Sequence, residues 1–463
     1  MSSSIYPAPE LLSPAGTRRA MQYAFAYGAD AVYAGQPRYS LRVRENEFNK
    51  LDIMAEAIAE AHRLGKKFYI ASNIAPHNSK VRSYLQNMEA VIDMQPDALI
   101  MSDPGLIMMV RERWPEMPIH LSVQANAVNF ATVRFWQKQG LSRVILSREL
   151  SIPEVAEIQQ ECPEMELEVF VHGALCIAYS GRCLLSGYMN HRDSNQGACT
   201  NACRWNYNVS EAEQTMEGDF QLKVLDTNEG GSCCGSQEAP SQAPPEERLF
   251  LLEEADRPGE FMPAFEDEHG TYIMNSRDLR AVEHVPEFVK MGLSSLKIEG
   301  RTKSYFYVAR TAQVYRRAID AATQGREVSI DLLQDLDSLS NRGYTDAFYS
   351  RRPISELQNY DTGRSMSQQQ QFVGDVIDRD GEHLVVEVKN RFEVGDTLEL
   401  MTPSGNSSFE LRGLCDRSGN AIEAAPGSPH VVRVPLPEEL RDAFTERDTQ
   451  FGLLMRTLVP APV

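Results

Sequence analysis

The stretch Glu166–Tyr207 reads ELEVFVHGALCIAYSGRCLLSGYMNHRDSNQGACTNACRWNY. It opens with a run of apolar residues, which is typical of a strand buried on both faces of a parallel sheet. Four of the eight cysteines of the chain follow within 28 residues. The stretch therefore predicts a buried strand that leads directly into a cysteine site made of Cys176, Cys183, Cys199 and Cys203.

The spacing of these cysteines limits the kinds of metal centre that they can bind. Four thiolates suit either an iron–sulfur cluster or a tetrahedral zinc ion. Structural zinc sites favour two close pairs, and only Cys199 and Cys203 form such a pair. The spacing favours a cluster, while a zinc site and a set of unrelated buried thiols remain as alternatives.

The strand in this stretch is one of eight that the sequence predicts. Short β-rich runs alternate with helical segments, and this order of strands and helices predicts a closed (β/α)8-type barrel. A doubly wound open sheet is the alternative, because sequence does not show closure. The predicted strands are Glu10–Ser13, Ala31–Ala34, Lys67–Ser72, Ala98–Ser102, Ile119–Gln124, Val144–Ser147, Leu167–His172 and Ser295–Glu299.

Helices are expected between these strands. Thr17–Tyr27 and Asp52–Leu64, for example, have apolar residues at helical spacing. Glycines at the ends of such segments are typical of helix C-caps. The glycines in question are Gly28, Gly65, Gly140 and Gly292.

The predicted domains follow from changes in sequence character. The α/β barrel domain spans residues 1–330 and contains a cysteine-rich excursion over residues 173–292, in which either a hairpin that turns at Gly270 or a strand that leads into a helix is expected. Within it, residues 228–247 are rich in Gly, Ser, Pro and Gln, which predicts a flexible insert. A linker is expected over 331–370. Short strands with Asp-Gly and Ser-Gly turns predict a small antiparallel β-barrel, a binding or docking module, over 371–463.

Composition limits the class of protein. The chain has no apolar run near the length of a membrane span, and MSSSIYPAPE at its start has neither a basic region nor an apolar core. We therefore expect a cytoplasmic protein, in which clustered thiols are more often metal ligands than disulfides. The net charge of −19 argues against indiscriminate nucleic-acid binding but allows a local basic patch.

Polar residues end the predicted strands, where a barrel of this kind has its active site. They include Arg148, His172, Glu299 and Arg301. Solvent exposure alone also explains polar strand ends. His172 has two interpretations, as an acid/base or outer-shell group four residues before Cys176, or as a structural histidine.

A segment rich in basic and aromatic residues follows the eighth strand. Arg301–Asp320, RTKSYFYVARTAQVYRRAID, predicts a helix that contains Lys303 and Arg310 among tyrosines. Such a helix can hold phosphates and stack bases. The alternative is a helix that covers the barrel with its apolar face and exposes its charges.

Several strings carry a resemblance to a known family. ELLSPAG, GADAVYAG, EVFVHGALCIAYSGRCLLSGY, GACTNACRW and SLKIEGRTKS resemble the collagenase-like peptidase family, called family U-32, over nearly the whole chain. NIAPHN, MSDPG and SVQAN are most similar to its bacterial branch required for 5-hydroxyuridine at the wobble position of tRNA. The resemblance implies a barrel with a 4Fe-4S cluster and prephenate as the apparent source of the hydroxyl oxygen.

By motif position, the resemblance makes Cys176, Cys183, Cys199 and Cys203 the iron ligands. Some relatives take the fourth ligand from further downstream, where this chain has Cys233 and Cys234. These two lie in the predicted insert, and adjacent residues of an extended chain point apart. Cys203 is therefore the expected ligand.

Candidate roles for the other residues follow from the two substrates that the resemblance implies. The two carboxylates of prephenate suit bidentate arginines, for which Arg148 and Arg301 are candidates, with Lys297 as a point charge. An exposed anticodon-loop base suits stacking and basic contacts. The RNA-binding candidates are Arg38, Arg42, Arg44, Lys303 and Arg310.

Two other functional classes compete with a tRNA hydroxylase. A peptidase, as the family name says, needs a nucleophile or a catalytic metal. The sequence contains no His-Glu-x-x-His pair, no Gly-x-Ser-x-Gly elbow and no Walker-type phosphate loop. The third class is a non-enzymatic iron–sulfur scaffold, or an RNA-binding partner for another enzyme. If the chain holds a cluster, as a hydroxylase or as a scaffold, an electron-transfer or cluster-assembly partner is also expected.

Overall fold

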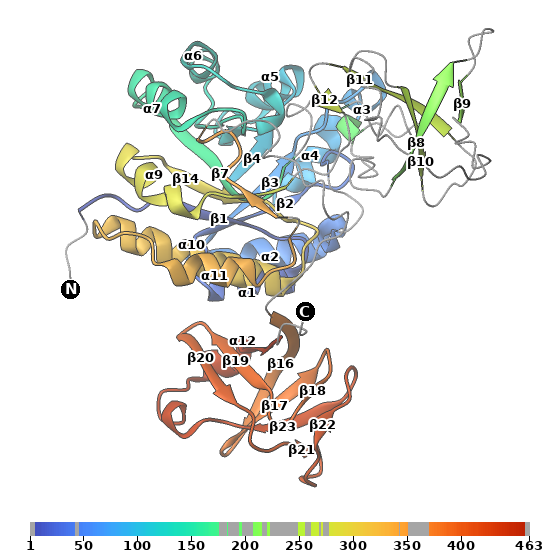
Figure 1. Cartoon of the computed structure of the whole chain (residues 1–463). Coiled ribbons are helices and arrows are strands. Elements are labelled where there is room, and N and C mark those ends of the chain that lie inside the picture. The colour runs from blue at the N-terminus through green and yellow to red at the C-terminus, as the bar shows by residue number, and fades with distance from the viewer. Residues whose placement is uncertain are drawn as a thin grey trace, which may run out of the picture.

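The protein is described here from a computed structural model. The structure describes residues 5–41, 46–175, 183, 194–196, 207–214, 220–222, 249–254, 261–267, 270–271, 277–341, 343–350 and 370–458. A barrel of parallel strands forms the larger domain, and an antiparallel sheet forms the C-terminal domain beside it (Figure 1). Among the described helices, none has both the length and the apolar character needed to cross a membrane.

Eight parallel strands close into a barrel. The last of them, β14, pairs with β1 through Ser295 and Glu10 and with β7 through Ser295 and Glu168. The predicted closed barrel is thus confirmed, and the open-sheet alternative is wrong. The barrel strands are β1 (Glu10–Pro14), β2 (Ala31–Gly35), β3 (Lys67–Ser72), β4 (Ala98–Met101), β5 (Ile119–Leu121), β6 (Arg143–Ile145), β7 (Glu166–Ala174) and β14 (Ser295–Ile298).

Helices cover the outside of this barrel (Figure 1). Side chains cap several of them in the expected way, as Thr17 does by accepting a hydrogen bond from the backbone of Ala20. Gly28, Gly65, Gly140 and Gly292 all have positive φ after helices, as predicted. The helices are α1 (Arg18–Ala26), α2 (Leu51–Arg63), α3 (Asn78–Val81), α4 (Tyr84–Ile92), α5 (Pro104–Arg113), α6 (Phe130–Lys138), α7 (Ile152–Glu161), α9 (Val285–Met291), α10 (Tyr305–Thr323) and α11 (Ile330–Asp337).

Several boundaries differ by a few residues from the sequence prediction, and two of them have a clear local cause. Helix α10 begins at Tyr305 and not at Arg301, because Gly300 has φ of 148° and Ser304 caps the helix by accepting from the backbone of Tyr307. Strand β5 ends at Leu121 because a 3-10 turn follows it over Val123–Ala125.

The predicted linker over 331–370 is wrong in its first part. This part of the chain contains α11 and the short strand β15 (Tyr344–Thr345), which pairs with β13 (Asp278–Arg280). Leu336 and Tyr349 from this segment are buried in the core of the barrel domain. This segment is mostly polar, and its sequence therefore did not indicate that its few apolar residues are buried.

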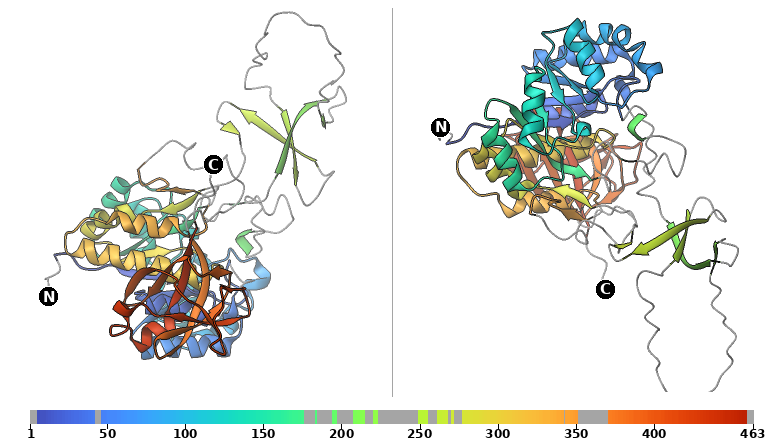
Figure 2. Two further views of the ribbon diagram at one scale, coloured as in Figure 1. Left: turned by 60° about the horizontal axis from the view of Figure 1, so that its bottom comes forward. Right: turned by 90° about the horizontal axis from the view of Figure 1, so that it is seen from above.

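The excursion after β7 contains a second sheet. Five short strands pair in the order β12-β11-β10-β8-β9, and β12 pairs antiparallel with β11 through Gly270 and Asp267, which agrees with a hairpin here (Figures 1 and 2). The chain then returns to the barrel through β13, which pairs antiparallel with β7. The predicted insert 228–247 lies outside the described residues. The five strands are β8 (Tyr207–Gln214), β9 (Phe220–Leu222), β10 (Leu249–Glu254), β11 (Phe261–Asp267) and β12 (Gly270–Thr271).

The C-terminal domain is antiparallel, as predicted. Seven strands pair in the order β20-β19-β24-β16-β17-β23-β21, around a core that includes Val386, Leu400 and Leu454. Its elements are β16 (Gln370–Asp380), β17 (His383–Val388), β18 (Phe392–Glu393), β19 (Thr397–Thr402), β20 (Gly405–Glu410), β21 (Cys415–Asp416), β22 (Ala424–Ala425), β23 (Val431–Pro435), α12 (Glu446–Phe451) and β24 (Leu453–Thr457).

Helix α10 joins the two domains. One side of it packs into the barrel core through residues such as Tyr315, and the other packs through Ala312 against Met455 of the C-terminal domain. Arg310 lies between them with no exposed surface, and its guanidinium donates to both carboxylate oxygens of Glu399 at 2.9 and 3.0 Å. The prediction of Arg310 as an RNA-binding residue is therefore wrong, because a buried, bidentate ion pair occupies its charge.

Candidate active site

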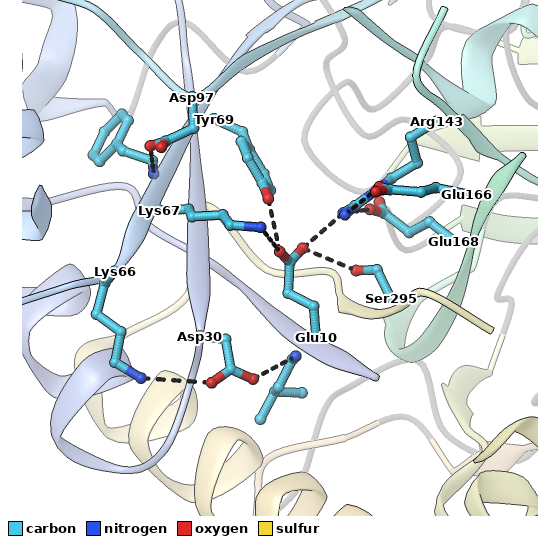
Figure 3. A network of polar contacts seen from close by, with 12 residues as sticks. Glu10, Asp30, Lys66, Lys67, Tyr69, Asp97, Arg143, Glu166, Glu168 and Ser295 are labelled. Atoms are coloured by element: carbon cyan, nitrogen blue, oxygen red, sulfur yellow. Dashed lines mark hydrogen bonds and ion pairs between the residues drawn. The ribbon is translucent and has the colours of Figure 1, made fainter. Parts of the chain in front are cut away.

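The bottom of the barrel is filled by an ion-pair network (Figure 3). Glu10 accepts from Arg143 at 2.6 Å, from Tyr69 at 2.7 Å and from Lys67 at 3.2 Å. Burial opposes ionisation of Glu10, but these partners outweigh it and lower the pKa of its carboxyl. Glu10, Lys67 and Arg143 each begin a strand, which places the network at the amino-terminal end of the barrel, where residues serve stability.

A second layer of charge lies above this network. Glu168 has no exposed surface and accepts from Arg143 at 3.1 Å and from Lys297 at 2.9 Å. Burial lowers the pKa of Lys297, and Glu168 counteracts part of that effect. The ammonium of Lys297 lies over the ring of Tyr33 at 4.3 Å and is also 5.4 Å from the ring centre of Phe170. Lys297 is thus a charge inside the barrel, below the strand ends.

Two arginines lie over the same two rings at the carboxyl-terminal ends of the strands. Arg148 stacks on Phe170 at 3.8 Å, and Arg301 lies 5.6 Å from the ring centre of Tyr33. Arg148 also donates to Glu299 at 3.3 Å and to the carbonyl of Ala174 at 2.8 Å. The structure therefore brings together three of the four predicted catalytic residues, Arg148, Glu299 and Arg301.

One hydrogen-bond donor of Arg148 is not used by the described part of the protein. Its Nε is buried and has no hydrogen-bond partner among the described residues. Buried polar atoms are normally paired, so this donor is available to a ligand, but Arg310 in the domain interface has a buried Nε in the same state and the feature does not by itself mark a binding site. Arg301 donates to Ser40 at 2.7 Å.

The ring of His172 packs among tyrosines, although its carbonyl accepts from the backbone of Glu299 at 2.8 Å. Its ring is 1% exposed and packs within 6 Å of the ring centres of Tyr307, Tyr315 and Tyr344. Burial is the main cause that lowers the pKa of His172 to about 3. A histidine that stays neutral near pH 7 does not supply a proton as a general acid. This environment supports the structural interpretation of His172 and argues against the general-acid role, while the general-base and outer-shell roles stay predictions.

One of the four cysteines lies within the described residues. The carbonyl of Cys183 accepts from Ser194 at 2.7 Å and from Asn195 at 3.1 Å. The carbonyl of Asn195 in turn accepts from the backbone of Ala75, three residues past the carboxyl-terminal end of β3. Cys183 is therefore tethered at the same end of the barrel as Arg148, a position that fits a cluster beside the site.

The other three cysteines, Cys176, Cys199 and Cys203, lie outside the described residues. Within the described residues, no group of three or more His, Cys, Asp or Glu side chains is arranged to hold a metal ion.

The predicted RNA-binding residues lie in different environments. Arg38 is exposed in the loop after β2, and Lys303 is exposed 5.3 Å from the ring centre of Tyr307. Arg42 and Arg44 lie outside the described residues. Arg38 and Lys303 are thus the two candidates that the structure describes at the surface.

Sequence reasoning missed Tyr33, Phe170 and Glu168, which form the floor of the site. A signal for them existed, because side chains alternate between the two faces of a strand. Lys297 and Glu168 are charges inside otherwise apolar predicted strands, and the positions two residues away point to the same side. Phe170 follows Glu168 by that interval.

The comparison with known proteins supplies the family. Residues 16–359 match Peptidase family U32, and residues 368–444 match the Peptidase family U32 C-terminal domain. The chain belongs to peptidase family U32. This U32 chain is 58% identical over 449 residues to "tRNA hydroxylation protein P" of Escherichia coli (strain K12), which covers 97% of the chain and 96% of that relative.

Other U32 relatives support the same branch. A protein of the same name from Haemophilus influenzae is 54% identical over 453 residues, with 97% of this chain and 96% of the relative covered. The "23S rRNA 5-hydroxycytidine C2501 synthase" of E. coli is 26% identical over 402 residues, with 85% of this chain and 52% of the relative covered. This U32 chain therefore belongs to the tRNA hydroxylation branch of the family.

Proposed function

We propose that this U32 protein hydroxylates RNA, and specifically the wobble uridine of tRNA to 5-hydroxyuridine, the first step toward 5-carboxymethoxyuridine or 5-methoxyuridine. The observation that carries the proposal is the 58% identity, over nearly the full length of both chains, to a tRNA hydroxylation protein. The relative that is a 23S rRNA 5-hydroxycytidine synthase acts on a pyrimidine of another RNA, which supports the reaction class.

The co-substrate in this proposal is prephenate, as the hydroxyl donor. Its two carboxylates need cations that are held in place, and Arg148 and Arg301 lie over adjoining rings with Lys297 beneath them. The buried Nε of Arg148 would donate to one carboxylate. Glu299, 3.3 Å from Arg148, keeps that guanidinium oriented while the site is empty of substrate.

The cofactor in this proposal is a 4Fe-4S cluster held by Cys176, Cys183, Cys199 and Cys203. Oxygen insertion at a pyrimidine carbon is redox chemistry, which amino-acid side chains do not perform alone and which a cluster would supply. The tether of Cys183 at the carboxyl-terminal end of the barrel supports this placement.

Mass spectrometry of tRNA nucleosides tests the proposal. Cells that lack the gene are complemented with the wild type, with Arg148→Ala, with Cys199→Ala and with Arg63→Ala, a control at an exposed position of α2. We expect 5-hydroxyuridine derivatives only with the wild type and the control. Restoration by Cys199→Ala would separate the activity from the cluster. Derivatives that persist in the uncomplemented cells would contradict the proposed role of the protein.

A further inference from the structure

A cavity of about 550 Å³ lies where the two domains meet, outside the barrel site. The loop between β14 and α10 and the start of α10 form one wall, and strands β16 and β24 of the C-terminal domain contribute to the other. The residues that matter for its chemistry are Lys303, Phe306 and Tyr307 on the barrel side and Gln371, Phe372 and Arg456 on the C-terminal side.

Flat aromatic surface spans the two walls. The rings of Phe306 and Phe372 stack across the domain boundary with centres 5.1 Å apart and planes 10° apart. Both side chains are half-buried, so part of this stack faces the cavity. A nucleic-acid base is a flat ring that extends such a stack, whatever its sequence.

The described lining of the cavity contains cations but no acidic residue, although the chain as a whole is strongly negative. None of the twelve described residues that line it is acidic, and two of them are cations. Lys303 is exposed. Arg456 is held by donating to Gln371 at 3.0 Å, and it also lies 3.6 Å from Asp396 outside the lining. Two cations beside a ring stack suit a phosphate that is attached to a base.

The cavity is connected to the barrel site by a short loop. The hydroxyl of Tyr307 donates to the carbonyl of Glu299 at 2.8 Å, and the backbone of Lys303 donates to the carbonyl of Gly300 at 2.9 Å. One side of the loop carries Glu299 and Arg301 of the site, and the other carries Lys303. The buried pair Arg310–Glu399 fixes the C-terminal wall against α10, so the distance between the cavity and the barrel site is fixed.

We propose that this cavity binds one unpaired nucleotide of the RNA substrate, near the one that reacts at the barrel mouth. Its base extends the Phe306–Phe372 stack, and its phosphate lies between Lys303 and Arg456. The inference rests on the proposed function, because it takes RNA as the substrate. It gives the C-terminal domain a direct part in substrate binding, since that domain supplies Phe372 and Arg456.

Binding of a fluorescein-labelled anticodon stem–loop RNA, measured by anisotropy on the full-length protein, tests the inference. Removing one stacking ring by Phe372→Leu keeps apolar volume in the interface, and we expect binding about tenfold weaker, in the range of a lost base stack. Phe372→Tyr keeps the ring and is expected to bind like the wild type. The pair of variants separates stacking from packing of the interface.

The charges are tested by the salt dependence of the same binding. Lys303→Gln/Arg456→Gln should reduce the slope of log Kd against log salt by about 0.7, the value for one phosphate contact on a single strand. Arg412→Gln is the matched control, because Arg412 is 88% exposed on the same domain and outside this cavity. The control should leave the slope unchanged.

Two kinds of failure are distinguishable. If the wild type binds the stem–loop and forms 5-hydroxyuridine but the cavity variants match it in affinity and slope, the inference is wrong and the proposed function stands. The inference is also wrong if the variants lose affinity equally for a hairpin of fully paired RNA. If the wild type neither binds the stem–loop nor restores 5-hydroxyuridine in cells, the proposed function itself fails.

Discussion

The ion pair between Arg310 and Glu399 gives a sharp prediction for stability. Both carboxylate oxygens of Glu399 accept from the guanidinium, and Gln370 donates to the same carboxylate at 2.6 Å. We consider the substitution Glu399→Ala. It removes the carboxylate and leaves the charge of Arg310 at a position with no exposed surface.

The expected loss of stability depends on which partners of Arg310 remain after the substitution. Loss of one partner from a buried ion pair costs about 3–5 kcal/mol, because the remaining charge is neither hydrated nor paired. Asp335 lies 3.4 Å from Arg310 and compensates in part. We therefore expect the free energy of unfolding to fall by about 3 kcal/mol, the lower end of that range. Replacing both members, as Arg310→Met/Glu399→Leu, should recover most of the loss, since well-packed apolar residues often substitute for a buried pair.

Urea unfolding followed by circular dichroism and by tyrosine and tryptophan fluorescence measures the effect. Glu393→Ala is the control, because Glu393 is half-exposed and pairs with the exposed Arg391. We expect the control to have nearly the wild-type midpoint and Glu399→Ala to unfold at clearly lower urea. If Glu399→Ala shifts the midpoint no more than the control does, the buried pair does not hold the domains together.

Three further predictions concern the site. In Glu168→Gln, Lys297 loses the partner that raises its pKa, so we expect prephenate binding, measured by calorimetry, to weaken as pH rises, while the wild type changes less. His172→Phe should keep the wild-type level of 5-hydroxyuridine in cells. Because the folded pKa of His172 is about 3, only the unfolded state takes up its proton between about pH 6 and pH 4, so His172 contributes a loss of stability of about 1.4 kcal/mol per pH unit there; thermal melts of His172→Phe should show a fall with pH that is smaller by this amount. Cys183→Ala, purified without oxygen, should contain less iron by colorimetric assay than Cys415→Ala, a control in the C-terminal domain, and equal iron would exclude Cys183 as a ligand.

The site also explains why much of its chemistry was predictable and some was not. Arg148, Glu299 and Arg301 were found because the ends of parallel strands meet at one end of a barrel, so order in the sequence predicts proximity. Tyr33 and Phe170, which support the cations, resemble ordinary apolar residues of buried strands. Their role depends on which side chains from other strands point at them.

The sequence by itself determined the local features of this protein. Alternation of strands and helices, glycines at helix ends and the turn at Gly270 depend on neighbouring residues, and the structure agrees with them. Only the tertiary structure decided closure of the barrel, through the pairing of β14 with both β1 and β7. It also decided the environments of His172 and Arg310, whose partners Tyr315 and Glu399 are 143 and 89 positions away. Burial and ion pairing depend on residues distant in the chain. For that reason the sequence predicted Arg310 as a surface charge, whereas in the structure it holds the two domains together.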